Sequence, residues 1–217
     1  MIKAVIFDLD GLLVDTEIIS FKIYEEMLFS FHISFTKQEY AEKYSGKTEI
    51  ANMTNLIQSY SLPWTVEEGL TKCIEIEERL LNQGVALKTG AKELLEYLKD
   101  NKYKIAVASS STTERAFKLL DQHNIRNMFD EFVFAEDVSH SKPNPEVFIK
   151  AYKKLGMKPI ECVVLEDSEN GILAANNASI PVICIPDMKT PSDKHLKLCL
   201  KVFSTLNEVR TFFMAQH

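Results

Sequence analysis

The chain has 217 residues, a formal net charge of −6, and apolar and charged fractions of 46% and 26%. This length suits one sizeable domain or a core domain with an insert, and the negative charge argues against a broad nucleic-acid-binding face. No apolar run approaches the roughly 20 residues that are needed to cross a bilayer. The four cysteines are scattered without a CxxC pair, which argues against a zinc knuckle or a disulfide framework and favours a cytoplasmic protein with reduced thiols.

The first predicted element is a short buried strand at residues 3–8 (KAVIFD), which begins too close to the N-terminus to leave room for a signal peptide. Three similar apolar runs follow much later, at residues 104–109 (KIAVAS), 161–165 (ECVVL) and 181–185 (PVICI). The stretches with helical periodicity beside these runs are residues 89–101, 112–123, 145–155 and 168–178. Strands that alternate with helices predict an α/β fold with a parallel sheet that is covered on both faces.

The region from about residue 14 to residue 84 breaks this alternation. It shows helical periodicity and no convincing buried strand, with one helix beginning near Ile18 and three more expected at residues 40–44, 49–60 and 66–81. The chain is therefore expected to leave the sheet after the first strand, build a helical bundle, and return near residue 85.

Polar residues occupy four segments where parallel strands should end, and this edge of an open α/β sheet forms the ligand crevice. The first segment is Asp8-Leu9-Asp10-Gly11. One carboxylate suits nucleophilic attack on phosphorus, the other suits proton transfer to and from the reacting oxygens, and Gly11 lets the backbone turn sharply. Taken alone, the segment also fits a strand-end turn with two solvated acids.

The second and third segments carry groups that bind anions. Ser109-Ser110-Ser111 offers hydroxyl and backbone N–H groups before a predicted helix, where phosphate binds well, although ordinary N-capping explains serines there equally. Lys142 lies in the stiff turn Ser-Lys-Pro-Asn-Pro, where its ammonium suits charge neutralisation, although a surface lysine is the simpler interpretation of this segment alone.

The fourth segment, LEDSENG at residues 165–171, places Glu166 and Asp167 directly after a strand. Adjacent acids suit a magnesium ion, which prefers one or two carboxylates, water and substrate phosphate. A charged helix N-terminus is the alternative. Four such segments in this order have no joint explanation as ordinary structural features.

These four segments resemble the four motifs of the haloacid dehalogenase superfamily. The similarity is greatest to the branch with a small helical cap inserted after the first motif, which includes β-phosphoglucomutases and sugar-phosphate phosphatases. The resemblance covers nearly the whole chain. It implies a Rossmann-like, doubly wound core of residues 1–14 and 85–217, with an α-helical cap domain at residues 15–84.

The resemblance also implies a role for each matching residue. Asp8 corresponds to the nucleophile, and Asp10 to the general acid and base. A Mg²⁺ cofactor would be held by Asp8, the backbone carbonyl of Asp10, and Asp167, with Glu166 acting through water. The residues implied to bind phosphate or substrate are Gly11, Ser109, Ser110, Lys142 and, in the cap loop at residues 46–48, Lys47.

The favoured function is a magnesium-dependent phosphatase that hydrolyses a small phosphorylated metabolite, with a sugar phosphate as the favoured class, through an aspartyl-phosphate. The first alternative is a β-phosphoglucomutase. Such mutases usually carry a histidine and an arginine where this chain has Ser20 and Lys47, and both departures favour the phosphatase. A non-catalytic metabolite-binding module has no need of both Asp8 and Asp10, and a receiver domain is too short to hold the helical insert. We expect no nucleic-acid or membrane partner, and a monomer or small homo-oligomer.

Overall fold

The computed structural model describes residues 1–215 and divides into two compact units. One unit is formed by residues 1–15 together with the chain from residue 86 onward, and the other by residues 16–85. The expected core range ends at residue 217, so its last two residues lie outside the described part of the chain. We call the two parts the sheet unit and the helical unit.

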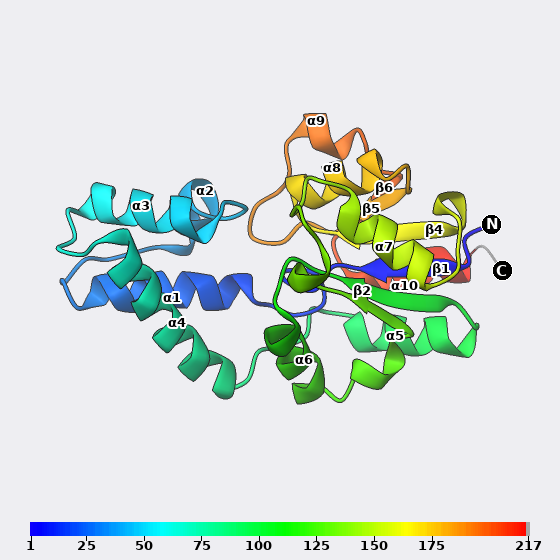
Figure 1. Ribbon diagram of the computed structural model, residues 1–217, viewed down its shortest axis with the longest axis horizontal. Helices are drawn as coiled ribbons and strands as arrows, with labels where there is room; N and C mark the ends of the chain where they lie inside the picture. Colours follow the sequence, from blue (N-terminus) through cyan, green and yellow to red (C-terminus); the bar gives the residue numbers. More distant parts are fainter. Residues whose placement is uncertain (216–217) are drawn as a thin grey trace. The chain divides into compact units, whose positions relative to one another are not determined.

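The sheet unit is built on one parallel sheet whose strand order is β3-β2-β1-β4-β5-β6 (Figure 1). Its strands are β1 (Ala4–Phe7), β2 (Lys104–Ala108), β3 (Glu131–Val133), β4 (Cys162–Glu166), β5 (Val182–Cys184) and β6 (Lys201–Val202). This topology confirms the predicted α/β fold class. The two outer strands β3 and β6 were not predicted, because runs of three and two residues carry too little periodicity to be recognised.

Helices cover both faces of the sheet. The helices of this unit are α5 (Ala91–Asp100), α6 (Thr113–Gln122), α7 (Glu146–Lys154), α8 (Glu169–Asn177), α9 (Asp193–Leu196) and α10 (Leu206–Met214). Three short 3-10 turns lie between them, at Arg126–Met128, Ala135–Asp137 and Pro159–Glu161. Helices α7 and α8 pack on one face, while α5 packs against β2 on the other with α10 beside it (Figure 1).

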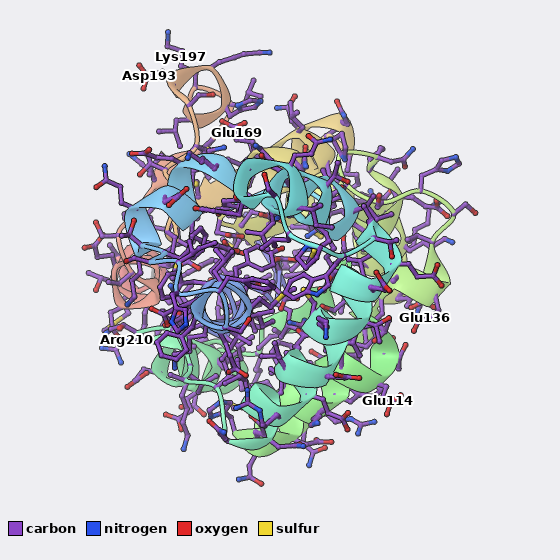
Figure 2. The ribbon with its side chains drawn as sticks, turned by 90° about the vertical axis from the view of Figure 1, so that its left-hand side faces the viewer. Glu114, Glu136, Glu169, Asp193, Lys197 and Arg210 are labelled. Atoms are coloured by element: carbon purple, nitrogen blue, oxygen red, sulfur yellow. The ribbon has the colours of Figure 1, made fainter. Side chains whose placement is uncertain are left out.

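The central strands are apolar along their whole length because both of their faces are buried. All four residues of β1 are 0% exposed. Ala4 and Ile6 belong to the same apolar cluster as Phe148 of α7 and Ile172 of α8. Charged side chains such as Glu114, Asp193 and Lys197 extend outward at the surface (Figure 2). Continuous apolar runs of this kind are what made β1, β2, β4 and β5 visible in the sequence.

The helical unit contains α1 (Glu17–Phe29), α2 (Lys37–Lys43), α3 (Glu49–Tyr60) and α4 (Val66–Asn82). Helix α4 packs against both α1 and α3. The rings of Tyr24 and Phe35 each lie 5.5 Å from that of Tyr44 and form the centre of an aromatic core. Thr65 begins α4 with a reciprocal cap, in which Thr65 and Glu68 accept each other's backbone N–H.

The two segments that join the sheet unit to the inserted residues run side by side. The N–H of Asp15 donates to the carbonyl of Ala86 at 2.9 Å, and the N–H of Lys88 donates to the carbonyl of Leu13 at 2.9 Å. These bonds pair the outgoing and returning chain before it enters α5. Within residues 1–215, no helix combines the length and the apolar character needed to cross a membrane.

Candidate active site

The predicted site residues of the sheet unit follow three neighbouring strands. Asp8 comes directly after β1, Ser109 directly after β2, and Glu166 is the last residue of β4. Phe7 is in register with Val107 on one side and with Leu165 on the other, so the three strands end at the same level. The sheet therefore gathers polar residues from positions far apart in the sequence at one edge.

Lys142 connects two of these carboxylates. Its Nζ lies 2.5 Å from Asp8 Oδ1 and 2.7 Å from Glu166 Oε1, and it also donates to the carbonyl of Ala108 at 3.2 Å. The side chains of Lys142, Asp8 and Glu166 are 8%, 10% and 1% exposed. One ammonium group is thus buried between two carboxylates, and a position that resembled a surface lysine in the sequence lies inside the site.

Burial and charge act in opposite directions on this group. Burial raises the pKa of Asp8, and the nearby Lys142 ammonium offsets only part of that rise. Burial alone would lower the pKa of Lys142, but the Asp8 and Glu166 carboxylates raise it above its usual range. Lys142 therefore remains a cation at neutral pH and supplies a fixed positive charge at the strand ends.

Glu166 is held in place by the two residues that lead into α8. Its Oε2 accepts from the N–H of Asp167 at 2.9 Å, the N–H of Ser168 at 2.9 Å and the hydroxyl of Ser168 at 3.0 Å. A Cβ on Gly171 would lie 1.8 Å from the carboxyl carbon of Glu166, so only glycine fits there. Gly171 was not among the predicted site residues, although it stands inside the fourth motif.

Three acids of this edge suit a hard divalent cation. Asp8, Glu166 and Asp167 each place one carboxylate oxygen so that all three lie within 4.8 Å of one another. Gly11 adopts φ +76°, and a Cβ at this position would lie 2.6 Å from Asp167 Oδ2, so the glycine leaves room for that carboxylate. Oxygen ligands of this kind and number fit Mg²⁺. The carboxylate of Asp10 does not belong to this group, and the ligand expected from Asp10 is its backbone carbonyl.

Asp10 lies in a different environment from Asp8. Its Oδ1 accepts from Arg115 Nη1 at 2.6 Å, and its Oδ2 accepts from the hydroxyl of Ser111 at 2.6 Å and from that of Ser109 at 3.5 Å. The side chains of Asp10 and Arg115 are 31% and 24% exposed. Arg115 was not predicted, because one basic residue in the first turn of a helix carries no signal in a single sequence.

The other residues that were predicted to bind phosphate or substrate, Ser109, Ser110 and Lys47, differ in burial and in the unit to which they belong. Ser109 is buried and its hydroxyl accepts from the N–H of Ser111 at 3.0 Å, whereas Ser110 is exposed. Thr112 caps α6, so the three serines do not perform that task, which was the alternative explanation for them. Lys47 belongs to the helical unit, where its exposed Nζ donates to the carbonyl of Lys43 at 2.5 Å. Its predicted contact with substrate stays a prediction.

The chain is similar to known proteins along most of its length. Residues 5–185 match the family model described as haloacid dehalogenase-like hydrolase. The chain belongs to this family. It is 30% identical over 178 residues to "Phosphorylated carbohydrates phosphatase" of Thermotoga maritima, with 82% of each chain covered. It is 28% identical to "Hexitol phosphatase B" of Escherichia coli strain K12, over 96% of this chain and 94% of that protein.

A solved structure shares the fold along nearly the whole chain. It is described as a putative beta-phosphoglucomutase from Thermotoga maritima, with a TM-score of 0.84, 25% identity and 99% of each chain covered. Together, these comparisons confirm the predicted family and, at the level of enzyme class, the predicted phosphatase.

Proposed function

We propose that the protein is a magnesium-dependent phosphatase that hydrolyses a small phosphorylated metabolite of the sugar-phosphate type through an aspartyl-phosphate on Asp8. The observation that carries the proposal is the buried group of Asp8, Lys142 and Glu166 beside Asp167. An acid that serves only as a surface turn does not need a buried ammonium beside it. The names of the relatives, a phosphorylated carbohydrates phosphatase and a hexitol phosphatase, support this substrate class.

A bound Mg²⁺ would be held by Asp8, Asp167 and the carbonyl of Asp10, with Glu166 behind them, and would reduce the repulsion between the carboxylate and an anionic phosphoryl group. The Lys142 ammonium also reduces this repulsion, because its positive charge lies beside Asp8. Its Nζ binds Asp8 Oδ1 and holds the carboxylate in place for attack. Because Lys142 is buried and fixed by three acceptors, its charge needs little reorganisation when the phosphoryl group enters.

The reaction proceeds in two displacements. One carboxylate oxygen of Asp8 forms a bond to phosphorus while the bond from phosphorus to the ester oxygen breaks, and the leaving oxygen takes a proton from Asp10. A water molecule then attacks phosphorus, gives its proton to Asp10 and displaces the Asp8 carboxylate, which releases inorganic phosphate. The hydroxyl of Ser109 and the nearby backbone N–H groups bind the phosphoryl oxygens.

The helical unit is proposed to act as the cap domain that admits the substrate and selects it, with Lys47 as one contact. This role rests on the family resemblance and on the position of the insert directly after the first motif. The proposed cytoplasmic location and monomeric or small oligomeric state rest on the sequence in the same way.

The first test is phosphate release from a panel of sugar and nucleotide monophosphates, measured with Mg²⁺ and with EDTA. Release that requires Mg²⁺ is expected for at least one sugar phosphate. The variant Asp8→Asn, which is nearly isosteric, should retain the circular dichroism spectrum and lose turnover by a factor of about 10⁴ or more. Asp121→Asn, a surface change at an exposed ion pair, serves as the matched control. Turnover that survives in Asp8→Asn would rule out the covalent mechanism.

The second candidate is a β-phosphoglucomutase, which the description of the Thermotoga structure favours. The panel separates the two activities when β-glucose 1-phosphate is included. Conversion to glucose 6-phosphate without phosphate release would identify a mutase, whereas release of phosphate from that compound or another identifies the proposed phosphatase. Asp10→Asn should slow either reaction by roughly 10²- to 10⁴-fold in single-turnover measurements.

A further inference from the structure

Asp187 belongs to the loop after β5, a segment to which none of the four motifs assigns a role. Strand β5 is the neighbour of β4, and Glu166 at the end of β4 is in register with Cys184 at the end of β5. The loop after β5 therefore leaves the sheet at the same edge as Glu166 and Asp167. The side chain of Asp187 is 8% exposed, and an acid this deeply buried needs partners for its oxygens.

The two carboxylate oxygens of Asp187 have different surroundings. Its Oδ1 is paired with the ammonium of Lys88, whose Nζ also lies 3.7 Å from Asp15 Oδ1. Its Oδ2 is buried and makes no hydrogen bond within residues 1–215, although the neighbouring N–H of Met188 is near enough to the carboxylate to lower its pKa. A buried acceptor without a donor costs about 1–3 kcal/mol, so an unsatisfied oxygen of this kind calls for an explanation.

The unsatisfied oxygen lies close to the edge where the metal ligands gather. The point that a Cβ on Gly11 would occupy is 3.1 Å from Asp187 Oδ2 and 2.6 Å from Asp167 Oδ2. Both oxygens thus lie near the position that a side chain of residue 11 would occupy, and glycine leaves this position open. The lysine on Oδ1 fixes the carboxylate, so that Oδ2 stays directed toward this space.

We propose that Asp187 is a positioning residue of the metal site, whose Oδ2 accepts a hydrogen bond from a water molecule bound to Mg²⁺. Mg²⁺ usually keeps several of its waters when it binds to protein carboxylates, and such waters need acceptors. Mutation of a group that contacts the ligands of a metal, rather than the metal itself, typically weakens the protein's affinity for that metal 10- to 100-fold. The inference rests on the proposed function, because it assumes the magnesium ion that the proposed function places at this edge of the sheet.

The test measures Mg²⁺ affinity directly, by isothermal titration calorimetry on the full chain without substrate. Asp187→Asn keeps the size of the side chain. Because the amide oxygen must face the Lys88 ammonium, the N–H₂ group takes the place of Oδ2 and cannot accept a hydrogen bond there. Its dissociation constant for Mg²⁺ should rise about tenfold or more relative to the original chain. Asp15→Asn is the matched control, because it removes a charge from the same lysine cluster but not the oxygen beside Gly11, and it should change the constant less than about twofold.

A second variant covers the case in which Asp187→Asn does not fold. Replacing the ion pair by apolar groups of similar size, as Lys88→Met with Asp187→Leu, removes the acceptor without leaving a buried charge unpaired, which proteins often tolerate. This variant should weaken Mg²⁺ binding to the same extent as Asp187→Asn. Unchanged affinity in whichever of the two variants folds would overturn the proposal.

Two other outcomes would also overturn it, and they differ in what they say of the proposed function. Equal weakening in Asp187→Asn and Asp15→Asn would show a general effect of charge and would leave the magnesium-dependent phosphatase standing. An original chain that does not bind Mg²⁺ at all would remove the basis of both the metal site and the proposed function.

Discussion

Asp8 and Asp10 stand two positions apart in the chain, and each is paired with one cation, yet their surroundings differ. Asp8 and its partner Lys142 are 10% and 8% exposed, whereas Asp10 and its partner Arg115 are 31% and 24% exposed. A buried pair loses the hydration of both charges and depends on its geometry, while a half-exposed pair can exchange protein contacts for water. The same type of pair is therefore expected to fix one carboxylate rigidly and to leave the other able to move.

This difference suits the two proposed roles. A nucleophile gains from a fixed position, because attack requires an oxygen held in line with the bond that breaks. A proton carrier must serve the leaving oxygen first and a water molecule afterwards. The surroundings of the two residues, rather than their spacing in the sequence, separate the rigid carboxylate from the adjustable one.

The largest effect is expected at the buried cation. Lys142→Met removes the counterion of Asp8 and Glu166, so the two buried carboxyls must stay charged without a partner or take up a proton. Breaking such a pair costs about 3–5 kcal/mol of unfolding free energy. Urea denaturation at neutral pH in EDTA measures this loss without compensation by a metal. Lys150→Met is the control, because Lys150 pairs with Glu146 while 41% exposed, and it should cost less than about 1 kcal/mol. Similar losses in the two variants would show that burial does not distinguish the pairs.

Glu166→Gln should have the next largest effect. Both oxygens of Glu166 accept from donors, Lys142 on one side and the backbone N–H groups of Asp167 and Ser168 on the other. An amide N–H₂ would therefore face a donor in either orientation. The expected loss is about 1–3 kcal/mol in the same denaturation experiment. Glu136→Gln is the matched control, because Glu136 also accepts from the start of a helix, at Thr113, but lies near the surface (Figure 2). A loss at Glu136 as large as that at Glu166 would contradict the explanation.

The sequence was sufficient to predict the strands that carry the motifs, for a clear physical reason. Strands β1, β2, β4 and β5 are buried on both faces and therefore appear as continuous apolar runs. The same burial makes the polar residues that follow them conspicuous, as at Asp8. Strands β3 and β6 have only three and two residues, with exposed or half-buried positions, and no such contrast marks them.

The long-range ion pairs around the site could not be predicted from the sequence in the same way. Arg115 reaches Asp10, and Lys88 reaches Asp187, across about a hundred positions of the chain. Nothing near Arg115 or Asp187 in the sequence signals these contacts, because the pairs are created by strand order. Lys142 was recognised through its motif, but its burial between two acids follows from the packing of the sheet unit.

A small effect is expected at the half-exposed pair. Arg115→Gln removes the cation from Asp10, but water can replace it, so the unfolding free energy should fall by less than about 1 kcal/mol. Because exposed charges are screened by salt, the difference from the original chain should shrink further in 1 M NaCl. Urea denaturation at low and high salt measures both quantities. A loss comparable to that of Lys142→Met would show that Asp10 is held as rigidly as Asp8.

The smallest effect is expected at Asp130, which lies before β3 and provides a partly buried reference outside the site for the comparison. Burial raises the pKa of Asp130. The N–H of Ile105 and the ammonium groups of Lys104 and Lys99 together lower this pKa by more than burial raises it, so the net shift is downward from the ordinary value of 3.8. The folded state therefore favours the ionised form. The stabilisation is complete at pH values above 3.8 and is lost as the pH falls through the lower pKa of the folded state.

Asp130→Asn should lower the unfolding free energy by about 0.5 kcal/mol at neutral pH, because the amide oxygen still accepts from Ile105 while both lysines are more than a third exposed. The difference from the original chain should stay constant from about pH 7 to pH 5 and decrease below about pH 4. Urea denaturation across this range tests the sign. A difference that grows toward acid would mean that the folded state favours the protonated carboxyl. The pKa of Asp130 would then be raised, as that of Asp8 is, and the contrast between the two carboxyls would fail.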